Sequence, residues 1–318
     1  MEGAHRRSYF YVGGEAVDDG TGSGHRVMMG QIQNWLNTPD GRQGWASWLL
    51  EQGYIVYLID QPARGRSPHH PSLGPTVSYP IELAERRWTA CKDFHDYPQA
   101  KLHTQWPGTG RMGDPAFDTY YATLLPSVTD FAKEQRLSQA AGAKLLDRIG
   151  PSIILSHSQG GTAGWLWADA RPELVKGIIA IEPSGPPFGS TIVKGKPSKP
   201  YGITDAPLTY DPPCSDGERP LDTAEHSASD GHRFRLQNEP ARKLVNLSRV
   251  PVMMVTGEAS SHAEYDGFTC RFLQQAGVNV RHVHLADEGI HGNGHLMFLE
   301  LNNLAIVEFL EKWFAKIA

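Results

Sequence analysis

The chain has few cysteines, no excess of basic residues and no long apolar run. It contains three cysteines in 318 residues, and no two of them form a C-x-x-C pair. An odd number of widely spaced cysteines predicts neither a disulfide framework nor a zinc site. The formal net charge is −5, so the chain lacks the basic footprint of nucleic-acid binding. These absences favour a small-molecule substrate over a nucleic-acid partner.

The first residues do not have the pattern of a targeting segment. Arginines at positions 6 and 7 precede a short, interrupted apolar stretch at residues 8–14, which is too short for the apolar region of a signal peptide. No stretch approaches the roughly 20 apolar residues that a membrane-spanning helix needs. The sequence therefore predicts a cytoplasmic protein with no membrane span.

The most informative segment is the pentapeptide SHSQG at residues 156–160. An apolar run at 152–155 precedes it and a small-residue helical pattern follows it, which predicts a strand, a sharp turn and a helix. This order is typical of a nucleophile elbow, which presents its serine at the apex and offers helix N–H groups to an oxyanion. Ser158 is the predicted nucleophile, although Ser156 replaces the first glycine of the G-x-S-x-G pattern.

Strand-like and helix-like segments alternate along most of the chain. Predicted buried strands cover 53–60, 152–155, 176–181, 250–257 and 278–285, and predicted helices cover 45–50, 81–93, 117–136, 162–168, 263–276 and 302–317. This alternation predicts an α/β fold with a mostly parallel sheet and helices on both faces. Residues 183–249 are irregular and rich in Pro, Gly and Ser, which predicts a lid insertion between two core parts, 1–182 and 250–318.

A serine nucleophile needs a base, and the base needs an orienting acid. The loop after the last predicted strand holds His291 and His295, and we favour His295 because an apolar helical run follows it and would fix its position. Three acids are candidates. Glu258 follows a predicted strand, Asp287 lies close in sequence to the histidines, and Glu182 ends a very apolar strand. An unpaired carboxylate at the end of that strand would be costly, so a histidine partner would explain Glu182.

The order of serine, acid and histidine resembles the α/β-hydrolase superfamily over nearly the whole chain. More narrowly, several strings are similar to a bacterial esterase subgroup with a Ser-Glu-His triad: TPDGR at 38–42, IDQ at 59–61, RGRS at 64–67, LSHSQ at 155–159, EP at 182–183 and HGNGH at 291–295. In that subgroup the acid follows the sixth strand and the base is the second histidine of the H-G-N-x-H string. The resemblance therefore implies an α/β-hydrolase whose catalytic triad is Ser158, Glu182 and His295.

The N-terminal region departs from this subgroup. Its members have an apolar strand ending in His-Gly, and the loop after that strand supplies an oxyanion donor in addition to the N–H that corresponds here to Gln159. In this chain residues 27–30 run almost directly into the next matching segment. The strand is either much shortened, with Gln31 or Ile32 as the second donor, or it is missing. Loss of one donor costs on the order of two to three powers of ten in rate, so the second alternative predicts impaired hydrolysis.

The resemblance implies a serine hydrolase that cleaves a carboxylic ester or a lactone through an acyl-enzyme on Ser158. The alternatives are an impaired or non-hydrolytic member of the fold, acting as a binding protein or biosynthetic helper, and a lyase or isomerase with a histidine base. No cofactor or metal is predicted, because the glycines between positions 13 and 24 lack the strand-to-helix context of a phosphate loop. The sequence makes no prediction of the oligomeric state.

Overall fold

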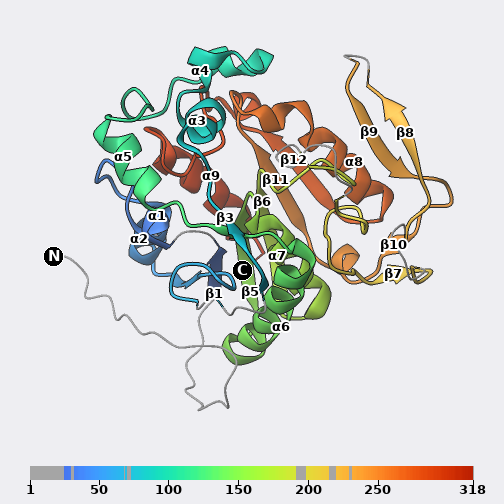
Figure 1. Ribbon diagram of the computed structural model, residues 1–318. Coiled ribbons are helices and arrows are strands. Elements are labelled where there is room, and N and C mark those ends of the chain that lie inside the picture. The colour runs from blue at the N-terminus through green and yellow to red at the C-terminus, as the bar shows by residue number, and fades with distance from the viewer. Residues whose placement is uncertain are drawn as a thin grey trace.

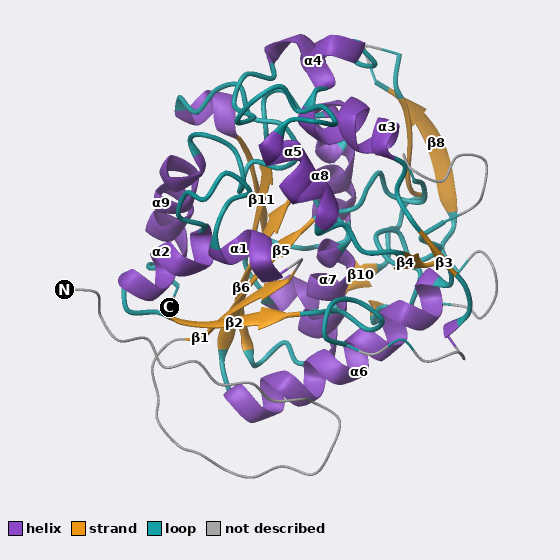
Figure 2. Ribbon diagram, turned by 60° about the vertical axis from the view of Figure 1, so that its left-hand side comes forward, coloured by secondary structure: helices purple, strands orange, loops and turns teal. Residues whose placement is uncertain are grey.

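A computed structural model describes residues 25–29, 32–67, 69, 73–190, 198–214, 220–228 and 231–317. Six parallel strands form a central sheet in the order β12-β11-β6-β5-β1-β2. Their bounds are β1 His25–Met29, β2 Ile55–Ile59, β5 Ser152–His157, β6 Val175–Ile181, β11 Val252–Thr256 and β12 Val280–His284. Figures 1 and 2 show the twisted sheet with helices packed on both sides. The predicted α/β fold is confirmed.

The sheet separates two hydrophobic cores. Helices α6 (Phe131–Ile149), α7 (Gly160–Ala170) and α8 (Asp266–Gln275) contribute to one core, and α1 (Ile32–Leu36), α2 (Trp45–Glu51) and α9 (Asn303–Phe314) contribute to the other. Successive strand residues point to opposite faces, so Ile154 joins the first core and its neighbour Leu155 joins the second. Near-continuous apolar strands such as β5 are required because both faces of this sheet are covered.

The segment between β2 and β5 is more broken than the sequence predicts. Residues 81–93 form α3 (Ile81–Ala84), a π-helical turn η2 (Glu85–Thr89) and α4 (Cys91–Phe94), and residues 117–136 belong to two helices, α5 (Pro115–Ala122) and α6. Between them, β4 (Ser127–Val128) pairs with β3 (Thr76–Val77). Pro126 ends the helical pattern because it lacks an N–H, and the Asp130 side chain then caps α6 by accepting from the Lys133 N–H at 3.0 Å.

Short 3-10 turns occur at several places along the chain. They are η3 (Pro98–Leu102), η4 (Leu247–Arg249), η5 (Ser261–Glu264) and η6 (Leu285–Glu288).

The structure corrects the prediction for β2 and decides between the two alternatives for β1. The prediction of a buried β2 is wrong, because β2 ends the order of the described sheet and all five of its residues are only half-buried. In contrast, β1 is a paired strand that lies between β2 and β5, with Met29 beside Ser156. The shortened strand is therefore present, and the chain leaves it at the same sheet edge as the elbow. Gln31, the predicted second donor, lies outside the described residues.

The described parts of residues 183–249 form several small pieces. β7 (Tyr210–Asp211) pairs with β10 (Lys243–Leu244), and β8 (Thr223–Ser227) forms a hairpin with β9 (Arg233–Gln237) that stands beside α8 (Figure 1). Ile203, Leu208 and Leu244 join the core of α6, α7 and α8. These contacts attach much of the segment to the side of the domain, and its role as a lid stays a prediction.

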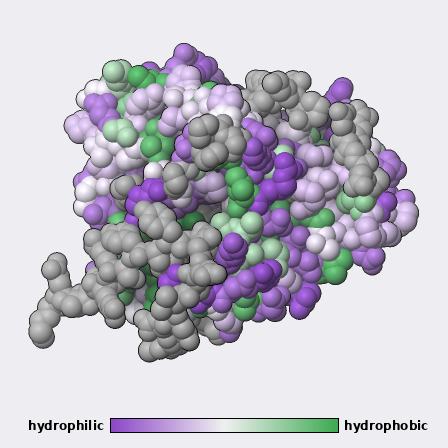
Figure 3. Space-filling view, turned by 60° about the horizontal axis from the view of Figure 1, so that its bottom comes forward, coloured by the Kyte–Doolittle hydropathy of each residue, from purple (hydrophilic) through white to green (hydrophobic). Residues whose placement is uncertain are grey.

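The described surface carries little contiguous apolar area. On the face shown in Figure 3, hydrophobic residues form small groups among hydrophilic ones. The exposed large apolar side chains come from distant parts of the sequence: Val77, Leu102, Met112, Leu137, Val245 and Leu301. None of the helices described here is long and apolar enough to cross a bilayer.

Candidate active site

Ser158 lies in the turn between β5 and α7. Its φ angle is +53°, which is uncommon for a residue with a side chain and typical of a nucleophile elbow. Two backbone hydrogen bonds hold the turn to the chain that leaves β6: the Ser158 N–H donates to the Ile181 carbonyl at 3.1 Å, and the Ser184 N–H donates to the Ser158 carbonyl at 2.9 Å. The neighbouring strand therefore supports the strained conformation.

The departure from G-x-S-x-G at Ser156 has a steric explanation. Ser156 is fully buried and faces Gly164 of α7, where an added Cβ would lie 3.1 Å from the Ser156 Oγ. A small residue is thus still needed at this contact, and the helix supplies it. One turn earlier, a Cβ on Gly161 would lie 2.6 Å from the Pro183 Cβ, so α7 also packs closely on the segment after β6.

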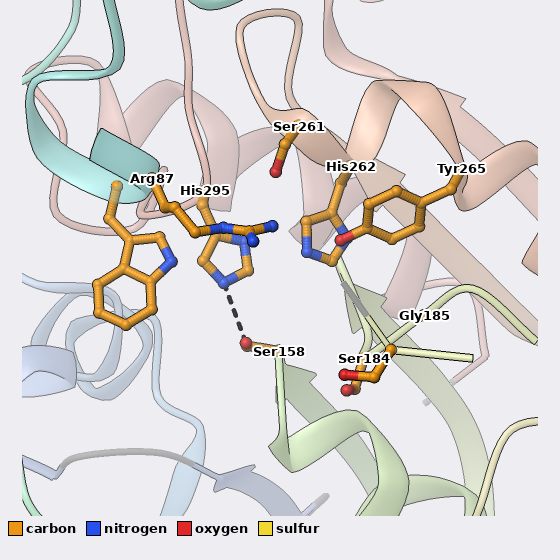
Figure 4. A pocket seen from close by; sticks show the side chains of 10 residues that line it. Arg87, Ser158, Ser184, Gly185, Ser261, His262, Tyr265 and His295 are labelled. Carbon is orange, nitrogen blue, oxygen red and sulfur yellow. Dashed lines mark hydrogen bonds between the residues drawn. The ribbon is translucent and has the colours of Figure 1, made fainter. Parts of the chain in front are cut away.

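The structure brings together the three residues that the resemblance implied. The Ser158 Oγ lies 3.0 Å from Nε2 of His295 (Figure 4). Nδ1 of His295 lies 2.6 Å from Oε2 of Glu182. Glu182 is fully buried and also accepts hydrogen bonds from the Gly257 N–H at 2.8 Å and the Ser260 hydroxyl at 2.7 Å. Three donors thus converge on one carboxylate, which holds it as the acceptor for the imidazole.

The other candidates for base and acid lie apart from Ser158. Nδ1 of His291 lies 3.2 Å from Oε1 of Glu258, and the Gly292 N–H donates to the other oxygen of that carboxylate at 2.8 Å. The His291 side chain is 63% exposed, so this is a surface pair. Asp287 is exposed in η6. The geometry thus distinguishes residues that sequence order alone left as alternatives.

His295 is packed between two other histidines. Its ring centroid lies 4.4 Å from that of His157 and 4.7 Å from that of His262. Burial lowers the pKa of His295 well below its ordinary value, and His157, His262 and Arg87 lower it further through charge repulsion. Burial also raises the pKa of Glu182, while the hydrogen bonds from Ser260 and Gly257 oppose this rise. His295 is therefore neutral near pH 7, the state that a general base requires.

A second buried carboxylate supports the loop that carries His295. Glu300 accepts hydrogen bonds from the Gly294 N–H at 3.0 Å, the Asn293 side chain at 2.8 Å and Nε2 of His103 at 2.7 Å. Both side chains of the His103 and Glu300 pair are essentially inaccessible to solvent. Sequence reasoning missed this pair, and its one visible signal was a glutamate within the apolar run that follows His295.

The TPDGR string has a structural role next to this loop. The Arg42 guanidinium donates to the carbonyls of Leu299 at 2.7 Å and Glu300 at 2.8 Å, and it pairs with Asp40 at 2.6 Å. The string therefore fixes the chain just after His295 and takes no part in the contacts of Ser158. Sequence reasoning also missed Ser260, whose hydroxyl donates a hydrogen bond to Glu182.

A large cavity of about 520 Å³ opens on one side of Ser158. Its apolar walls come from α1, the segment between β2 and α6, and the chain after His295: Trp35, Tyr79, Trp88, Tyr120, Leu124, Phe131, Leu296 and Phe298. Its polar lining includes Arg64, Gln135, Ser198, Lys199 and Asp205. The Gln159 side chain also lines the cavity and accepts a hydrogen bond from Arg64 at 2.6 Å. The cavity can hold an elongated, mainly apolar group next to the serine.

A much smaller chamber of about 30 Å³ also borders Ser158, and its lining is mostly polar. Figure 4 shows this chamber, with Arg87 above His295 and with His262 and Tyr265 across from it. The remaining lining is Trp88, Ser184, Gly185, Ser190 and Ser261. The two spaces meet at Ser158 and His295, so groups on the two sides of an ester would meet very different surroundings.

Among the described residues, Glu182, His262 and His295 form the one group whose types and spacing resemble a metal site, with ligand atoms within 4.8 Å of one another. Glu182 and His295 are already hydrogen-bonded at 2.6 Å. A metal ion on both would have to replace that hydrogen bond. The arrangement that is present favours acid–base chemistry at Ser158.

Comparison with known proteins agrees with the geometry. No family model matches the chain. A protein named probable secreted lipase phiG, from a fungal species (strain ATCC 74256), is 43% identical over 331 residues, which cover 99% of this chain and 91% of that protein. A novel bacterial esterase has a similar fold, with a TM-score of 0.56 and 20% identity over 92% of this chain and 81% of the esterase.

The fungal relative corrects the prediction of a cytoplasmic protein. The relative is named as secreted, and at 43% identity over nearly the full chain it points to secretion, so the cytoplasmic prediction is wrong. That prediction rested on an odd number of cysteines and on the pattern of the first residues. Neither feature decides where a chain is delivered, because cysteines that stay unpaired occur in secreted proteins as well.

Proposed function

The chain belongs to the α/β-hydrolase superfamily and is a carboxylic ester hydrolase, and we propose that it cleaves its substrate through an acyl-enzyme on Ser158. The observation that carries the proposal is the continuous set of contacts from the Ser158 Oγ through His295 to Glu182, at 3.0 and 2.6 Å. These distances lie within the range in which a base activates a hydroxyl nucleophile and an acid orients the base. We assign the three residues the roles of nucleophile, base and orienting acid.

In the proposed first step, the Ser158 Oγ attacks the ester carbonyl carbon and its proton passes to Nε2 of His295. The Glu182 carboxylate holds the Nδ1 proton, which keeps the lone pair on Nε2 toward the serine. His295 then donates the proton to the leaving alkoxide oxygen as the carbon–oxygen bond breaks. Water reverses the sequence and releases the carboxylic acid. The lowered pKa of His295 supports this role, because the base is neutral before attack.

We assign the Gln159 N–H, at the start of α7, as one donor to the oxyanion. Gln31 stays our candidate for the second donor, although it lies outside the described residues. The pairing of β1 with β5 supports this assignment, because it brings the end of β1 to the level of Ser156. We therefore expect ordinary turnover instead of the impaired hydrolysis that a missing strand would cause.

The two spaces beside Ser158 suggest the substrate class. The cavity of about 520 Å³ is large enough for an acyl group of medium length or for a ring system, with a polar atom received near Arg64 or Lys199. The exposed apolar side chains of the described surface are scattered, which favours a dispersed ester or lactone over the surface of a lipid droplet. Ser184, Ser190 and Ser198 line the cavity, so residues 184–205 are the part of the proposed lid that would affect specificity.

The direct test is hydrolysis of p-nitrophenyl esters with short, medium and long acyl chains by the purified chain. Ser158→Ala should lower kcat by a factor on the order of 10⁴ to 10⁶. Ser156→Ala is the matched control, because it changes a serine two residues away that contacts Gly164 and not His295. Near wild-type turnover by Ser158→Ala, or an equal loss in both variants, would refute the proposed nucleophile.

We also propose that the chain is secreted, as the name of its fungal relative states for that protein. The test is to express the protein in its native host and to assay both the culture fluid and the cell lysate with an antibody. Recovery from the lysate alone would contradict secretion.

A further inference from the structure

The small chamber contains a second buried histidine–carboxylate pair. Nδ1 of His262 lies 3.0 Å from Oδ1 of Asp266, and Asp266 is fully buried. The other oxygen of that carboxylate accepts from the Thr256 hydroxyl at 2.8 Å, and Thr256 Oγ1 lies 2.9 Å from Nε2 of His282. Because both oxygens of Asp266 are occupied, the carboxylate orients the His262 ring as firmly as Glu182 orients His295.

The ring of His262 stacks on the ring of His295. The centroids are 4.7 Å apart and the ring planes differ by 10°. In each ring Nδ1 faces a buried carboxylate, which leaves Nε2 as the nitrogen that is available to the chamber. With a proton on Nδ1 toward Asp266, the neutral form of the His262 ring has a lone pair at Nε2 that can accept a hydrogen bond. His157 has no such freedom, because its Nε2 donates to the His295 carbonyl at 2.8 Å.

The chamber has the size and lining for water. A buried water needs roughly 10–15 Å³ and two to four polar partners, and the chamber measures about 30 Å³. Its partners include His262, His295 and the hydroxyls of Ser184 and Ser261. A water that donates to two acceptors through hydrogen bonds of about 2.8 Å spans about 4.5 Å between them, given its near-tetrahedral angle. The ring centroids of His262 and His295 are 4.7 Å apart, so both imidazoles lie within reach of a single water in the chamber.

We propose that His262, held by Asp266, orients the water that hydrolyses the acyl-enzyme on Ser158. The inference rests on the proposed acyl-enzyme mechanism and assigns a residue to its second half. The leaving alcohol and the attacking water occupy the same side of the acyl carbon, because both exchange a proton with Nε2 of His295. The chamber and the large cavity both border Ser158 and His295, and we assign the chamber, which His262 lines, to the water and the large cavity, which Gln159 lines, to the acyl group.

In the proposed hydrolysis of the acyl-enzyme, one O–H of the water donates to Nε2 of His262 and stays intact. The other O–H faces Nε2 of His295. The water oxygen forms a bond to the acyl carbon while its proton moves to His295. The tetrahedral intermediate then collapses, the bond to the Ser158 Oγ breaks, and His295 returns the proton to that oxygen. His262 neither gains nor loses a proton overall.

The test separates acylation from deacylation. With p-nitrophenyl butyrate in a stopped-flow instrument, the rate constant of the burst reports acylation and the steady state reports deacylation. His262→Phe keeps an aromatic ring against His295 but has no acceptor. We expect kcat to fall by about 10- to 100-fold while the burst rate constant stays within about twofold, with the burst approaching one nitrophenolate per protein. Intact mass measurement should then show the butyryl group on the protein during turnover.

Two further variants distinguish an acceptor role of His262 from a purely structural one. His262→Gln retains a side-chain acceptor and should recover part of the lost kcat, which a purely structural role would not predict. His291→Phe removes an exposed histidine whose partner is Glu258, and it should match the wild type in both phases. Thermal melting of all variants checks that they fold.

Equal losses in the burst rate constant and kcat, or no loss in either, would overturn the assignment of His262. A loss of kcat in His262→Phe that changes with the leaving alcohol at a fixed acyl group would also overturn it, because deacylation of one acyl-enzyme does not depend on the alcohol that has already left. Failure of the acyl-enzyme mechanism itself has a different signature. In that case neither the wild type nor any variant would show a burst or a butyryl adduct that depends on Ser158.

Discussion

Among the residues that the structure describes, two buried histidine–glutamate pairs differ in protonation. His295 lies 2.6 Å from Glu182, and His103 lies 2.7 Å from Glu300. Burial lowers the pKa of both histidines. For His103, the charge of Glu300 and contacts with Cys91 outweigh burial and raise the pKa to about 10, which gives a charged pair.

For His295, the surrounding groups act in the opposite direction. His157, His262 and Arg87 add to burial and hold the pKa of His295 well below its ordinary value. The comparison shows that a nearby carboxylate does not by itself determine the state of a histidine, because burial and the other groups around the ring also shift its pKa. The His103–Glu300 pair is therefore a structural ion pair beneath the loop that carries His295. The His295–Glu182 pair provides a neutral base on that loop.

The largest expected effect comes from neutralising the acid of the catalytic pair. Glu182→Gln keeps the size of the side chain but cannot hold the Nδ1 proton in the same way, so the orientation of His295 is lost. We expect kcat to fall by a factor on the order of 10⁴, as is typical when an orienting carboxylate becomes an amide. Steady-state hydrolysis of a p-nitrophenyl ester measures this loss, and a fall of less than tenfold would argue against Glu182 as the acid.

The corresponding change in the structural pair should act on stability. His103→Gln leaves the buried Glu300 without a cationic partner, and breaking a buried pair from one side costs about 3–5 kcal/mol. Urea unfolding at pH 7 measures this difference in the free energy of unfolding. If the variant were as stable as the wild type, the charged state assigned to His103 would be wrong.

The two pairs should also respond to pH in opposite directions. The pKa of folded His103 is raised to about 10, so its contribution to stability is complete below the unfolded value of about 6.5 and is lost as the pH rises through 10. The pKa of His295 is lowered, so kcat/KM should persist as the pH falls below 6.5 and decline only at lower pH. Urea midpoints and pH–rate profiles measure the two effects. An acid limb centred above pH 6.5 would contradict a lowered pKa at His295.

The smallest expected effect concerns Arg87, which contributes to the lowered pKa of His295. Arg87→Met removes the positive charge and keeps much of the apolar stem, so the acid limb of the pH–rate profile should move to higher pH. High salt should also move the acid limb of the wild type to higher pH, because salt screens the charge of the Arg87 guanidinium. It should have little effect on the variant, which lacks that charge. An unchanged limb would show that burial and the two histidines suffice.

The sheet and the catalytic candidates could be predicted because their signals are local. The elbow combines an apolar strand, a serine and a small-residue helix within 19 residues, and β5 (Ser152–His157) and α7 (Gly160–Ala170) confirm its secondary structure. Glu182 is a candidate because a charge at the end of an apolar strand is costly without a partner, and the resemblance to the Ser-Glu-His esterase subgroup selects it over Glu258 and Asp287. Order along the chain then brought His295 to the same edge of the sheet.

The remainder of the site depends on contacts between distant segments. His103 and Glu300 are separated by 197 positions, and no local pattern marks His103 as buried. His262 follows β11 in a short 3-10 turn whose sequence resembles an ordinary helix start, so only packing shows that it stacks on His295. The break of the segment 81–93 into three pieces also depends on tertiary contacts, because its residues have adequate helix propensity.

The most direct test of the account is to identify the residue that carries the acyl group. The protein is mixed with p-nitrophenyl butyrate, quenched in acid during turnover, digested and analysed by tandem mass spectrometry. The account predicts a butyryl group on Ser158 that is absent from Ser158→Ala and forms far more slowly in Glu182→Gln. Sustained, enzyme-dependent turnover with the butyryl group on another residue, or with no adduct on Ser158 in either the wild type or His262→Phe, would contradict it.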